Sequence, residues 1–336
     1  MSAAASHRTV SGEEGGMRLD RWFKVNYPQI THAYLNKLLR TGQVRVDGAR
    51  VKGNARLEEG QDIRVPPLAY ETRAADAPRE AKPLSKQDRS FLKDMVIFED
   101  KDLMILNKPS GLAVQGGTKT ARHLDGLLDS LAAELGERPR LVHRLDRDTS
   151  GVLVVAKRRS VASSLGRLFA TRSVHKFYWA LVRGVPKPAQ GKVEKSLVKM
   201  AGPEGDRVRA ARAGEQDTAQ HAVTHYAVID RAAHKVAWLS LKPVTGRQHQ
   251  LRAHVAMIGH PILGDNKYGG DDFSEESGLG LDGIENRLHL HARRIRFPHP
   301  REGMVDVTAP LPDHMRASFA LLGFDPDRYD VQDGDE

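Results

Sequence analysis

The residues best equipped for chemistry lie between positions 141 and 157, in the string LVHRLDRDTSGVLVVAK. The apolar run GVLVVAK predicts a strand, and the loop before it contains His143, Arg144, Asp146 and Asp148. Loops at strand ends often carry catalytic groups, and arginines beside a carboxylate keep it ionised. The pattern therefore indicates either a catalytic carboxylate or a turn stabilised by salt bridges, and Asp148 suits the turn better.

The spacing of the histidines argues against a metal site. His249 and His254 are five residues apart, which places them on different faces of a helix. His289 and His291 share one face of a predicted strand, but no third ligand accompanies them, so structural or RNA-contacting roles are favoured. The chain has no cysteine, which excludes thiolate metal sites, disulfide bonds and cysteine nucleophiles.

The elements that must position these residues predict an α+β fold with a mixed, largely antiparallel sheet. Strand-like runs often follow one another without an intervening helix, which favours antiparallel pairing. These runs are MVIF, DLMILNKP, GVLVVAK, FYWALV, KVAWLSLKP and LHLHARRIRF. Helical patterns lie at residues 124–135, 160–169 and 249–258.

Residues 17–66 predict a small separate domain with two helices and a β-hairpin. Thr31 is placed to cap the second helix, and Gly42 is placed to end it. The dipeptide Asp47-Gly48 lies between two alternating runs, which is typical of a tight hairpin turn.

Positive charge is concentrated in this small domain. It has ten Lys and Arg against five Asp and Glu, a net charge of +5 out of +9 for the chain. Such clustering favours a polyanionic partner, because neutralising phosphates releases counterions, although a solvated charged face without a partner is the alternative. The residues that we expect to bind RNA are Arg18, Arg21, Lys37, Arg40, Arg45, Arg50 and Lys52.

Composition also sets the expected domain limits. Residues 1–16 predict a disordered start, residues 67–90 a linker rich in Pro, Ala and charge, residues 91–311 the α+β domain, and residues 312–336 a segment with an acidic tail. The sequence has no apolar run near the ~18 residues of a membrane span, and no secretory signal at its start. We expect a monomer in the cytoplasm.

Several ordered motifs resemble those of the RluA family of pseudouridine synthases. HRLDRDTSGVLVVAK resembles the family signature, LNKPSGLAVQGG its first motif, KFYWALV its Lys-x-Tyr-x-Ala pattern and PVTGRQHQLRAH its third motif. Residues 17–66 resemble the alpha-L RNA-binding domain. The residues of these motifs are most similar to those of the RluC-like branch, which acts on large-subunit (23S) ribosomal RNA. Gln248 departs from the family, which more often has Thr at this position.

The resemblance implies isomerisation of specific uridines to pseudouridine in 23S ribosomal RNA, with Asp146 as the catalytic carboxylate. It further implies that Arg247 forms an ion pair with Asp146, and the alternative for Arg247 is a contact with an RNA phosphate. Tyr178 would stack on the target base, and Arg144 would enter the space that the flipped base vacates. The reaction involves no net redox change, so no cofactor is expected. The carboxylate could attack C1′, attack C6 or remove the 2′ proton, and the sequence does not separate these routes.

Three alternatives stay open. The first is a pseudouridine synthase that acts on transfer RNA or on another ribosomal site. The second is a non-catalytic RNA-binding factor for ribosome assembly, which the intact Asp146, Tyr178 and Arg247 argue against. The third is an N-glycosidase or nuclease with Asp146 and Asp148 as paired carboxylates, for which no other residue supports activation of water.

Overall fold

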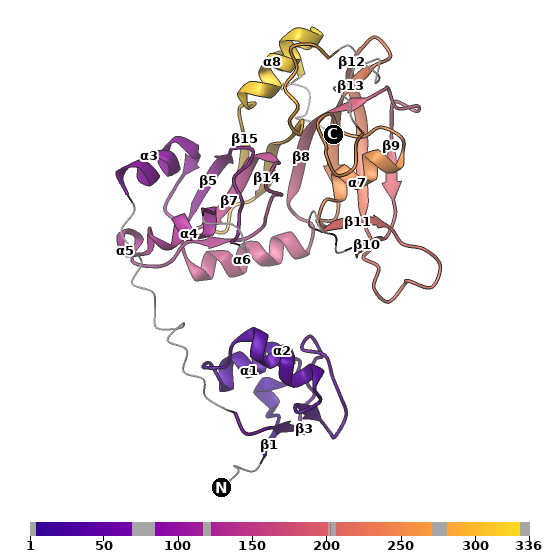
Figure 1. Cartoon of the computed structure of the whole chain (residues 1–336). Coiled ribbons are helices and arrows are strands. Elements are labelled where there is room, and N and C mark those ends of the chain that lie inside the picture. The colour runs from indigo at the N-terminus through magenta and orange to yellow at the C-terminus, as the bar shows by residue number, and fades with distance from the viewer. Residues whose placement is uncertain are drawn as a thin grey trace. The chain divides into compact units, whose positions relative to one another are not determined.

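The chain forms two compact units, Met1–Glu80 and Ala81–Glu336, and each buries its own hydrophobic core (Figure 1). This structure, a computed structural model, describes residues 5–68, 85–116, 122–200, 202, 206–270 and 281–329.

The N-terminal unit packs two helices against a small sheet with strand order β1-β3-β2. Each helix buries its apolar face, so that Trp22 and Leu38 lie in one core with Ile63. The elements are β1 Ser6–Thr9, η1 Gly12–Glu14, α1 Leu19–Asn26, α2 His32–Arg40, β2 Arg45–Val46 and β3 Asp62–Val65.

Two short-range predictions for this unit are confirmed. The hydroxyl of Thr31 accepts a hydrogen bond from the backbone N–H of Tyr34 at 3.2 Å and so caps α2. Asp47 and Gly48 have φ values of +48° and +75°, as a two-residue hairpin turn requires. The second arm of the predicted hairpin forms no strand; β2 pairs instead with β3, which follows later in the chain.

The prediction of a disordered start is wrong for residues 5–16. Strand β1 pairs antiparallel with β3, and Val10 is buried in the core of the unit. The stretch is therefore ordered by partners about fifty residues away, which its own composition does not reveal. Residues 1–4 lie outside the described residues.

The larger unit is built on one ten-stranded sheet, and this confirms the predicted α+β, mixed and largely antiparallel fold. The main path runs β4-β5-β7-β14-β8-β13-β12-β9, with β6 paired to β7 and β15 to β14. The pair β7–β14 is parallel, and the other neighbours are antiparallel. The strands, including the separate pair β10–β11, are β4 Val96–Glu99, β5 Leu103–Lys108, β6 Arg140–Leu141, β7 Ser150–Ala156, β8 His175–Arg183, β9 Gln190–Glu194, β10 Leu197–Met200, β11 Arg207–Ala210, β12 Val223–Ala232, β13 Val236–Pro243, β14 Leu290–Pro298 and β15 Met304–Thr308.

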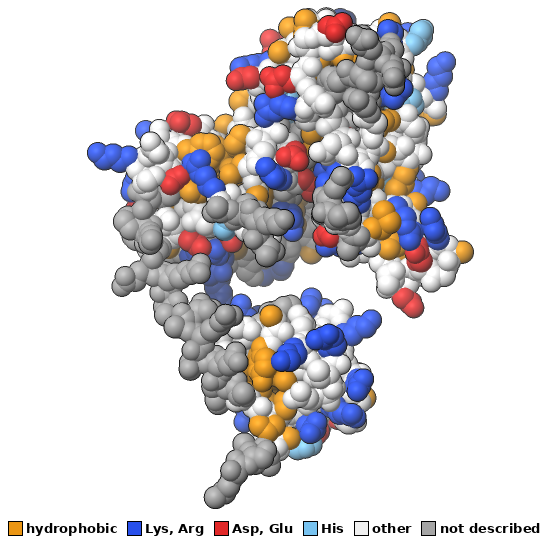
Figure 2. All heavy atoms as spheres, viewed as in Figure 1, with side chains coloured by type: hydrophobic (Ala, Val, Ile, Leu, Met, Phe, Trp, Pro, Cys, Tyr) orange, Lys and Arg blue, Asp and Glu red, His pale blue; other side chains and the backbone are white. Residues whose placement is uncertain are grey.

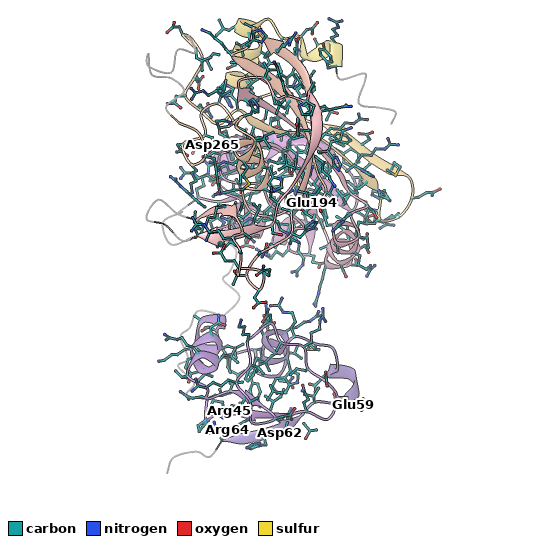
Figure 3. The ribbon with its side chains drawn as sticks, turned by 90° about the vertical axis from the view of Figure 1, so that its right-hand side faces the viewer. Arg45, Glu59, Asp62, Arg64, Glu194 and Asp265 are labelled. Carbon is teal, nitrogen blue, oxygen red and sulfur yellow. The ribbon has the colours of Figure 1, made fainter. Side chains whose placement is uncertain are left out.

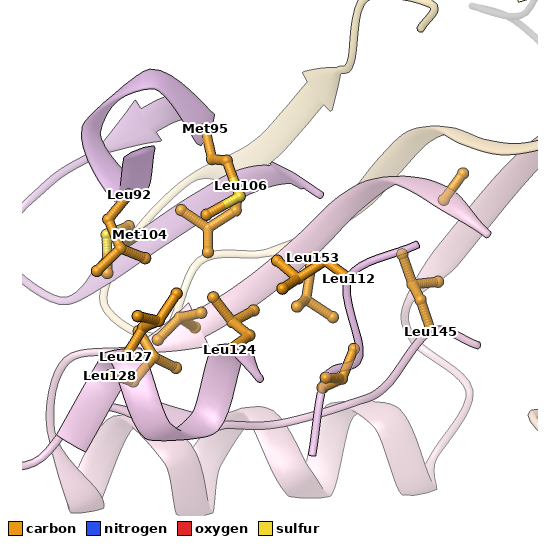
Figure 4. Close-up of a cluster of buried hydrophobic side chains, with 13 residues drawn as sticks. Leu92, Met95, Met104, Leu106, Leu112, Leu124, Leu127, Leu128, Leu145 and Leu153 are labelled. Carbon is orange, nitrogen blue, oxygen red and sulfur yellow. The ribbon is translucent and has the colours of Figure 1, made fainter. Parts of the chain in front are cut away.

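Helices cover both faces of this sheet. Leu124 and Leu128 pack with Leu106 and Leu153 of the strands on one face (Figure 4), while Leu165 packs on the other. Strand β7 is buried along its whole length because it is covered on both sides. The helices are α3 Lys86–Met95, α4 Leu124–Asp129, α5 Ala132–Leu135, α6 Arg159–Ala170, α7 Gln250–Met257, α8 Asp313–Leu322 and α9 Pro326–Tyr329, so the pattern over 124–135 forms two helices rather than one.

The predicted linker extends too far toward the C-terminus. Ser85 caps α3 by accepting the N–H of Asp88 at 3.0 Å, and Leu92 and Met95 of this helix enter the core on β5. The apolar face of α3 outweighs the charged composition of its first turns. Residues 69–84 of the predicted linker lie outside the described residues.

The predicted boundary at residue 312 is also wrong. Helix α8 buries Met315 and Phe319 against Trp238 and Trp179, so it belongs to the core of the larger unit. Tyr329 of the predicted acidic segment packs edge-on against Trp238, with ring centroids 5.2 Å apart. The end of the acidic tail, residues 330–336, lies outside the described residues.

Candidate active site

A cavity of about 560 Å³ opens at the start of strand β7. Its walls come from the loop before β7, from strand β8 and from the turn that leads into α7. Asp146, Arg144, Tyr178 and Arg247 all line it. The structure therefore brings together the four residues that the sequence selected in this unit.

A buried lysine, Lys108, holds the loop that carries Asp146. The ammonium group of Lys108 donates to the carbonyl oxygens of Pro109, Leu112 and Arg147, each at 2.9 Å. Burial lowers the pKa of Lys108 to about 7, although the Asp148 and Asp146 carboxylates act in the opposite direction. All three donors of the ammonium are used inside the protein, so Lys108 fixes the loop rather than contacting a substrate.

His143 holds the same loop from the other side. Its Nε2 accepts the backbone N–H of Val154 at 2.9 Å, and its ring stacks on Phe169 with centroids 4.9 Å apart. Burial, with a smaller effect of the Lys176 charge, lowers the pKa of His143 to about 3. His143 is therefore a neutral structural residue.

A glycine is required where β7 leaves this loop. Gly151 has φ +108°, and a Cβ atom there would lie 2.2 Å from the carbonyl oxygen of Ala292 on β14. No other residue lets β7 and β14 run this close. The glycine thus fixes how far Asp146 stands from the end of the parallel strand pair.

Asp146 lies in the cavity with 22% of its side chain exposed. The Nε2 atom of His249 is 3.9 Å from its Oδ1 atom. The Asp146 charge also contributes to the raised pKa of Arg252, a cavity residue whose own hydrogen bonds go to Asp265 at 2.7 and 2.6 Å. Burial lowers the pKa of His249, so the group beside the carboxylate is a neutral imidazole, and the nearby positive charge is that of Arg252. Asp146 keeps an open side toward the cavity.

The predicted ion pair between Arg247 and Asp146 is not formed between these two described residues. The Nε of Arg247 donates instead to the carbonyl oxygen of His221 at 3.1 Å, and the side chain is exposed at the cavity rim. Arg252 follows five residues later, in the first turns of α7, and this position turns it inward toward the carboxylates. The nearby guanidinium is Arg252.

His249 connects Asp146 to a second tyrosine. It caps α7 in a left-handed conformation, with φ +50°, and its Nδ1 is 3.0 Å from the hydroxyl of Tyr268. The backbone N–H of Val208 already donates to that hydroxyl at 2.7 Å, so the phenol proton is directed to Nδ1. The ring proton of His249 then lies on Nε2, which faces Asp146.

Tyr178 occupies strand β8 on the cavity side of the sheet. Burial, reinforced by the Asp146 carboxylate, raises the pKa of Tyr178 well above its usual value of 10. The side chain is therefore a neutral phenol with a proton to donate, and its ring forms part of the cavity wall. Arg144, which is exposed, lines the same cavity from the loop before β7.

The N-terminal unit presents most of its predicted RNA-binding cations to solvent. Lys and Arg side chains spread over the visible face of this unit (Figure 2). Arg45, which pairs across the strands with Arg64 (Figure 3), is half-buried and donates to the carbonyl oxygens of Gly42 and Gly48. Arg18 forms an ion pair with Asp20. The exposed members are Arg18, Arg21, Lys37, Arg40, Arg50 and Lys52.

A search of the described part of the chain for three or more His, Asp and Glu side chains placed to hold a metal ion finds none. His289 and His291 are both buried, with hydrogen bonds to Ser318 and Ser150 respectively. They are structural, which is one of the two roles expected for them. Within the same described ranges, no helix combines the length and apolar character needed to traverse a bilayer.

Comparison with known proteins identifies this arrangement. A family model described as RNA pseudouridylate synthase matches residues 102–257, which include the cavity residues through Arg252. Ribosomal large subunit pseudouridine synthase C of Escherichia coli O157:H7 is 37% identical over 320 residues, covering 93% of this chain and 95% of that protein. The chain belongs to the RluA family of RNA pseudouridine synthases. The Haemophilus influenzae protein of the same name is also 37% identical, over 94% of each chain.

Solved structures place the synthase fold in the larger part of the chain. Human RNA pseudouridylate synthase domain containing 4 has a TM-score of 0.58 and 32% identity, covering 70% of this synthase and 97% of that chain. Human RNA pseudouridylate synthase domain containing 1 has a TM-score of 0.52 and 27% identity, covering 65% of this chain and 83% of that chain. The α+β fold expected from the sequence is that of pseudouridine synthases.

Three residues around the synthase cavity were not singled out by sequence reasoning. Arg252 lies in the motif that also contains Arg247, and only the start of α7 shows which arginine faces the carboxylates. Tyr268 lies in the string GHPILGDNKYG, whose spacing indicates no partner for His249. Lys108 lies in the first motif, where its three carbonyl partners become visible only in the fold.

Proposed function

We propose that this enzyme isomerises specific uridines of 23S ribosomal RNA and that Asp146 is its catalytic carboxylate. The names of the curated relatives support the substrate. One observation supports the catalytic role of Asp146. This residue lies on a loop held by hydrogen bonds, lines the cavity, and has one side open to it. The ring of His249 lies 3.9 Å from its Oδ1 atom, and the charge of Asp146 acts on the guanidinium of Arg252.

The chemistry needs little beyond one carboxylate. The bond between C1′ and N1 breaks, the uracil turns and C1′ joins C5. C5 then loses its proton to solvent or to a nearby base, and N1 gains a proton, so that the product is an isomer of the substrate. Asp146 could support bond breakage by attack at C1′, by attack at C6 or by removal of the 2′ proton. Each route starts from the carboxylate anion, so all three depend on the same cationic surroundings.

Two further roles are proposed for cavity residues. The ring of Tyr178 would stack on the flipped uracil, and its proton, retained because of the raised pKa, would be available for transfer. Arg144 would fill the gap that the base leaves in the RNA, since its exposed side chain lies at the same cavity. Arg247 is reassigned from partner of Asp146 to contact with the RNA at the rim.

The N-terminal unit is proposed to be an alpha-L domain that anchors the RNA. Its exposed cations and its net charge of +5 over residues 17–66 support this role. The enzyme would meet the large-subunit RNA in the cytoplasm, and we propose that it acts as a monomer.

The replacement Asp146→Asn tests the catalytic proposal. It keeps the shape of the side chain and removes the charge, so the rate of pseudouridine formation on transcribed 23S RNA should fall on the order of 10³-fold or more. RNA binding should stay within a few-fold. The matched control is Asp148→Asn, two residues along the same loop, which should retain activity because that side chain pairs loosely with Arg147 at 3.9 Å. An active Asp146→Asn enzyme would refute the assignment.

The substrate is tested by mapping pseudouridines in total RNA with and without the gene. Loss of specific positions from 23S RNA is the expected result. Loss from transfer RNA alone would establish the alternative substrate instead, while leaving the assignment of Asp146 intact. Unchanged pseudouridine maps would rule out both 23S RNA and transfer RNA as substrates.

A further inference from the structure

Lys176 is a cavity lysine that the chemistry above does not use. It lies on strand β8 two residues before Tyr178, is half-buried and lines the cavity. Among the described residues, its ammonium group has no hydrogen bond or ion pair, whereas the ammonium of Lys108 has three carbonyl partners. An enclosed charge without a partner is unfavourable, so the position suits an anion brought by a ligand.

The carboxylate of the cavity does not fill this need. Asp146 raises the pKa of Tyr178, but the pKa of Lys176 is lowered by burial alone. Among the described residues, no ion pair joins Lys176 to Asp146. A bound anion beside Lys176 would offset the effect of burial and keep the ammonium charged.

Open space adjoins the ammonium group. A Cβ atom built on Gly246 would lie 3.8 Å from the Nζ of Lys176, and no other described atom outside Gly246 and its two chain neighbours would lie within 4 Å of it. Gly246 is exposed and belongs to the turn that leads into α7, so the space is reached from solvent. The exposed guanidinium groups of Arg172 and Arg247 line the same cavity and add positive charge around it.

We propose that Lys176, with the bare backbone of Gly246 beside it, binds the phosphodiester next to the flipped uridine. The inference rests on the proposed function, since it takes the cavity as the place where the nucleotide enters. RNA brings one anionic group for each nucleotide, and the phosphates nearest the target uridine must enter with it or remain at the rim. Lys176 then fixes how deeply the nucleotide enters, while Asp146 acts on the sugar and base.

The test compares Lys176→Met with neutral RNA linkages. The probe is a short RNA around a uridine identified by the mapping, either unmodified or with one methylphosphonate on its 5′ or 3′ side. Affinity is measured in the full-length Asp146→Asn background, so that bound RNA is not converted. Lys176→Met should weaken binding of unmodified RNA roughly tenfold or more, the range for one charge-assisted hydrogen bond. A neutral linkage on one side should weaken binding to the parent enzyme equally, and should cause no further loss with Lys176→Met.

Matched controls separate this interaction from general charge. Lys192→Met removes an exposed lysine that pairs with Glu194 at 2.7 Å on strand β9, and it should leave affinity within about twofold. Lys176→Arg should retain much of the affinity. Unchanged binding by Lys176→Met would overturn the proposal. The proposal would also be overturned if the loss of affinity from Lys176→Met and the loss from the neutral linkage multiplied when combined, because the two changes would then act at different places.

A second variant guards against a folding defect. Gly246→Ala keeps Lys176 and places a methyl group where the phosphate would approach, at ordinary van der Waals distance from Nζ. It should weaken RNA binding and leave the thermal unfolding midpoint unchanged; normal binding would count against the site. All these measurements compare affinities within one background, so a failure of the phosphate site is distinguished from a failure of the catalytic proposal, which only the rate of Asp146→Asn decides.

Discussion

The described neighbours of Asp146 do not occupy its oxygen atoms. Arg252 spends its hydrogen bonds on Asp265, and Nε2 of His249 stands 3.9 Å away, beyond hydrogen-bonding distance. The arginine therefore acts through its field, and the carboxylate oxygens stay available to the substrate. A direct ion pair with Arg247 would have blocked one of them.

Tyr268→Phe tests whether the orientation of His249 matters for the reaction. The change removes the O–H group that fixes the ring proton on Nε2, and it leaves the N–H of Val208 without its acceptor. We expect kcat to fall about tenfold, the value of one hydrogen bond of about 1.4 kcal/mol, with KM nearly unchanged. Single-turnover and steady-state assays on the same RNA would measure the two constants.

The control for Tyr268→Phe is a pair of changes at His249 itself. His249→Gln can place an amide N–H near the position of Nε2, and it should retain more activity than His249→Ala. Equal losses from both, or a change confined to KM, would mean that the ring only packs against Tyr268.

The sequence could place Asp146 in the loop before a buried strand, where the residues alone left a catalytic carboxylate and a salt-bridged turn open and the resemblance to the family signature favoured catalysis. It could not distinguish Arg247 from Arg252, since both occur in one motif and the first residue of α7 decides which side chain turns inward. The spacing of His249 indicates only that it is a poor metal ligand. Its interactions with Tyr268 and Asp146 join segments that are distant in sequence.

At the level of elements, the loop before β7 depends on Lys108, and pH provides a test. Lys108 has a folded pKa of about 7 against its usual 10.5, so between these values the unfolded chain holds a proton that the folded chain has released. The contribution of Lys108 to the free energy of unfolding therefore rises with pH between these two pKa values, by at most about 1.4 kcal/mol per pH unit. Relative to Lys108→Met, wild-type stability should increase between pH 7 and pH 9.

Urea denaturation of both proteins at several pH values measures that difference. Lys108→Met should also be less stable at every pH, because the buried carbonyl oxygens lose the three donors of the ammonium group, or the two of the neutral amine above pH 7. A difference in unfolding free energy that stays flat with pH would show that Lys108 keeps its proton throughout.

Elements fixed by neighbouring residues were predictable, and elements fixed by distant ones were not. The cap at Thr31 and the turn at Asp47-Gly48 depend on bonds within a few residues. Strand β1 exists because β3 pairs with it, and α8 joins the core because Trp238 receives Phe319. Polar or charged composition around β1 and α8 hid both from a local reading.

At the level of the whole chain, removing the N-terminal unit should change how binding responds to salt. Deleting residues 1–80 takes away the cations of that unit and leaves the cavity residues in place. RNA affinity should fall, and the slope of log affinity against log salt should flatten by about 0.7–0.9 for each phosphate that the shortened protein no longer neutralises. Filter binding between about 50 and 200 mM salt would measure the slope.

A subtler change in the intact chain serves as its control. Replacing the exposed Lys37 and Arg40 of α2 with glutamine should flatten the slope in the same direction, by a smaller amount. A slope that neither change alters would mean that the RNA is anchored by the larger unit alone.

The position of β14 in the sheet has a consequence for synthesis. This strand comes from residues 290–298, yet it lies between β7 and β8 and completes the seam at Gly151. During translation the seam cannot close until β14, residues 290–298, has left the exit tunnel. The described core of the N-terminal unit uses no residue beyond position 68. A nascent chain can therefore fold this unit long before it forms the cavity.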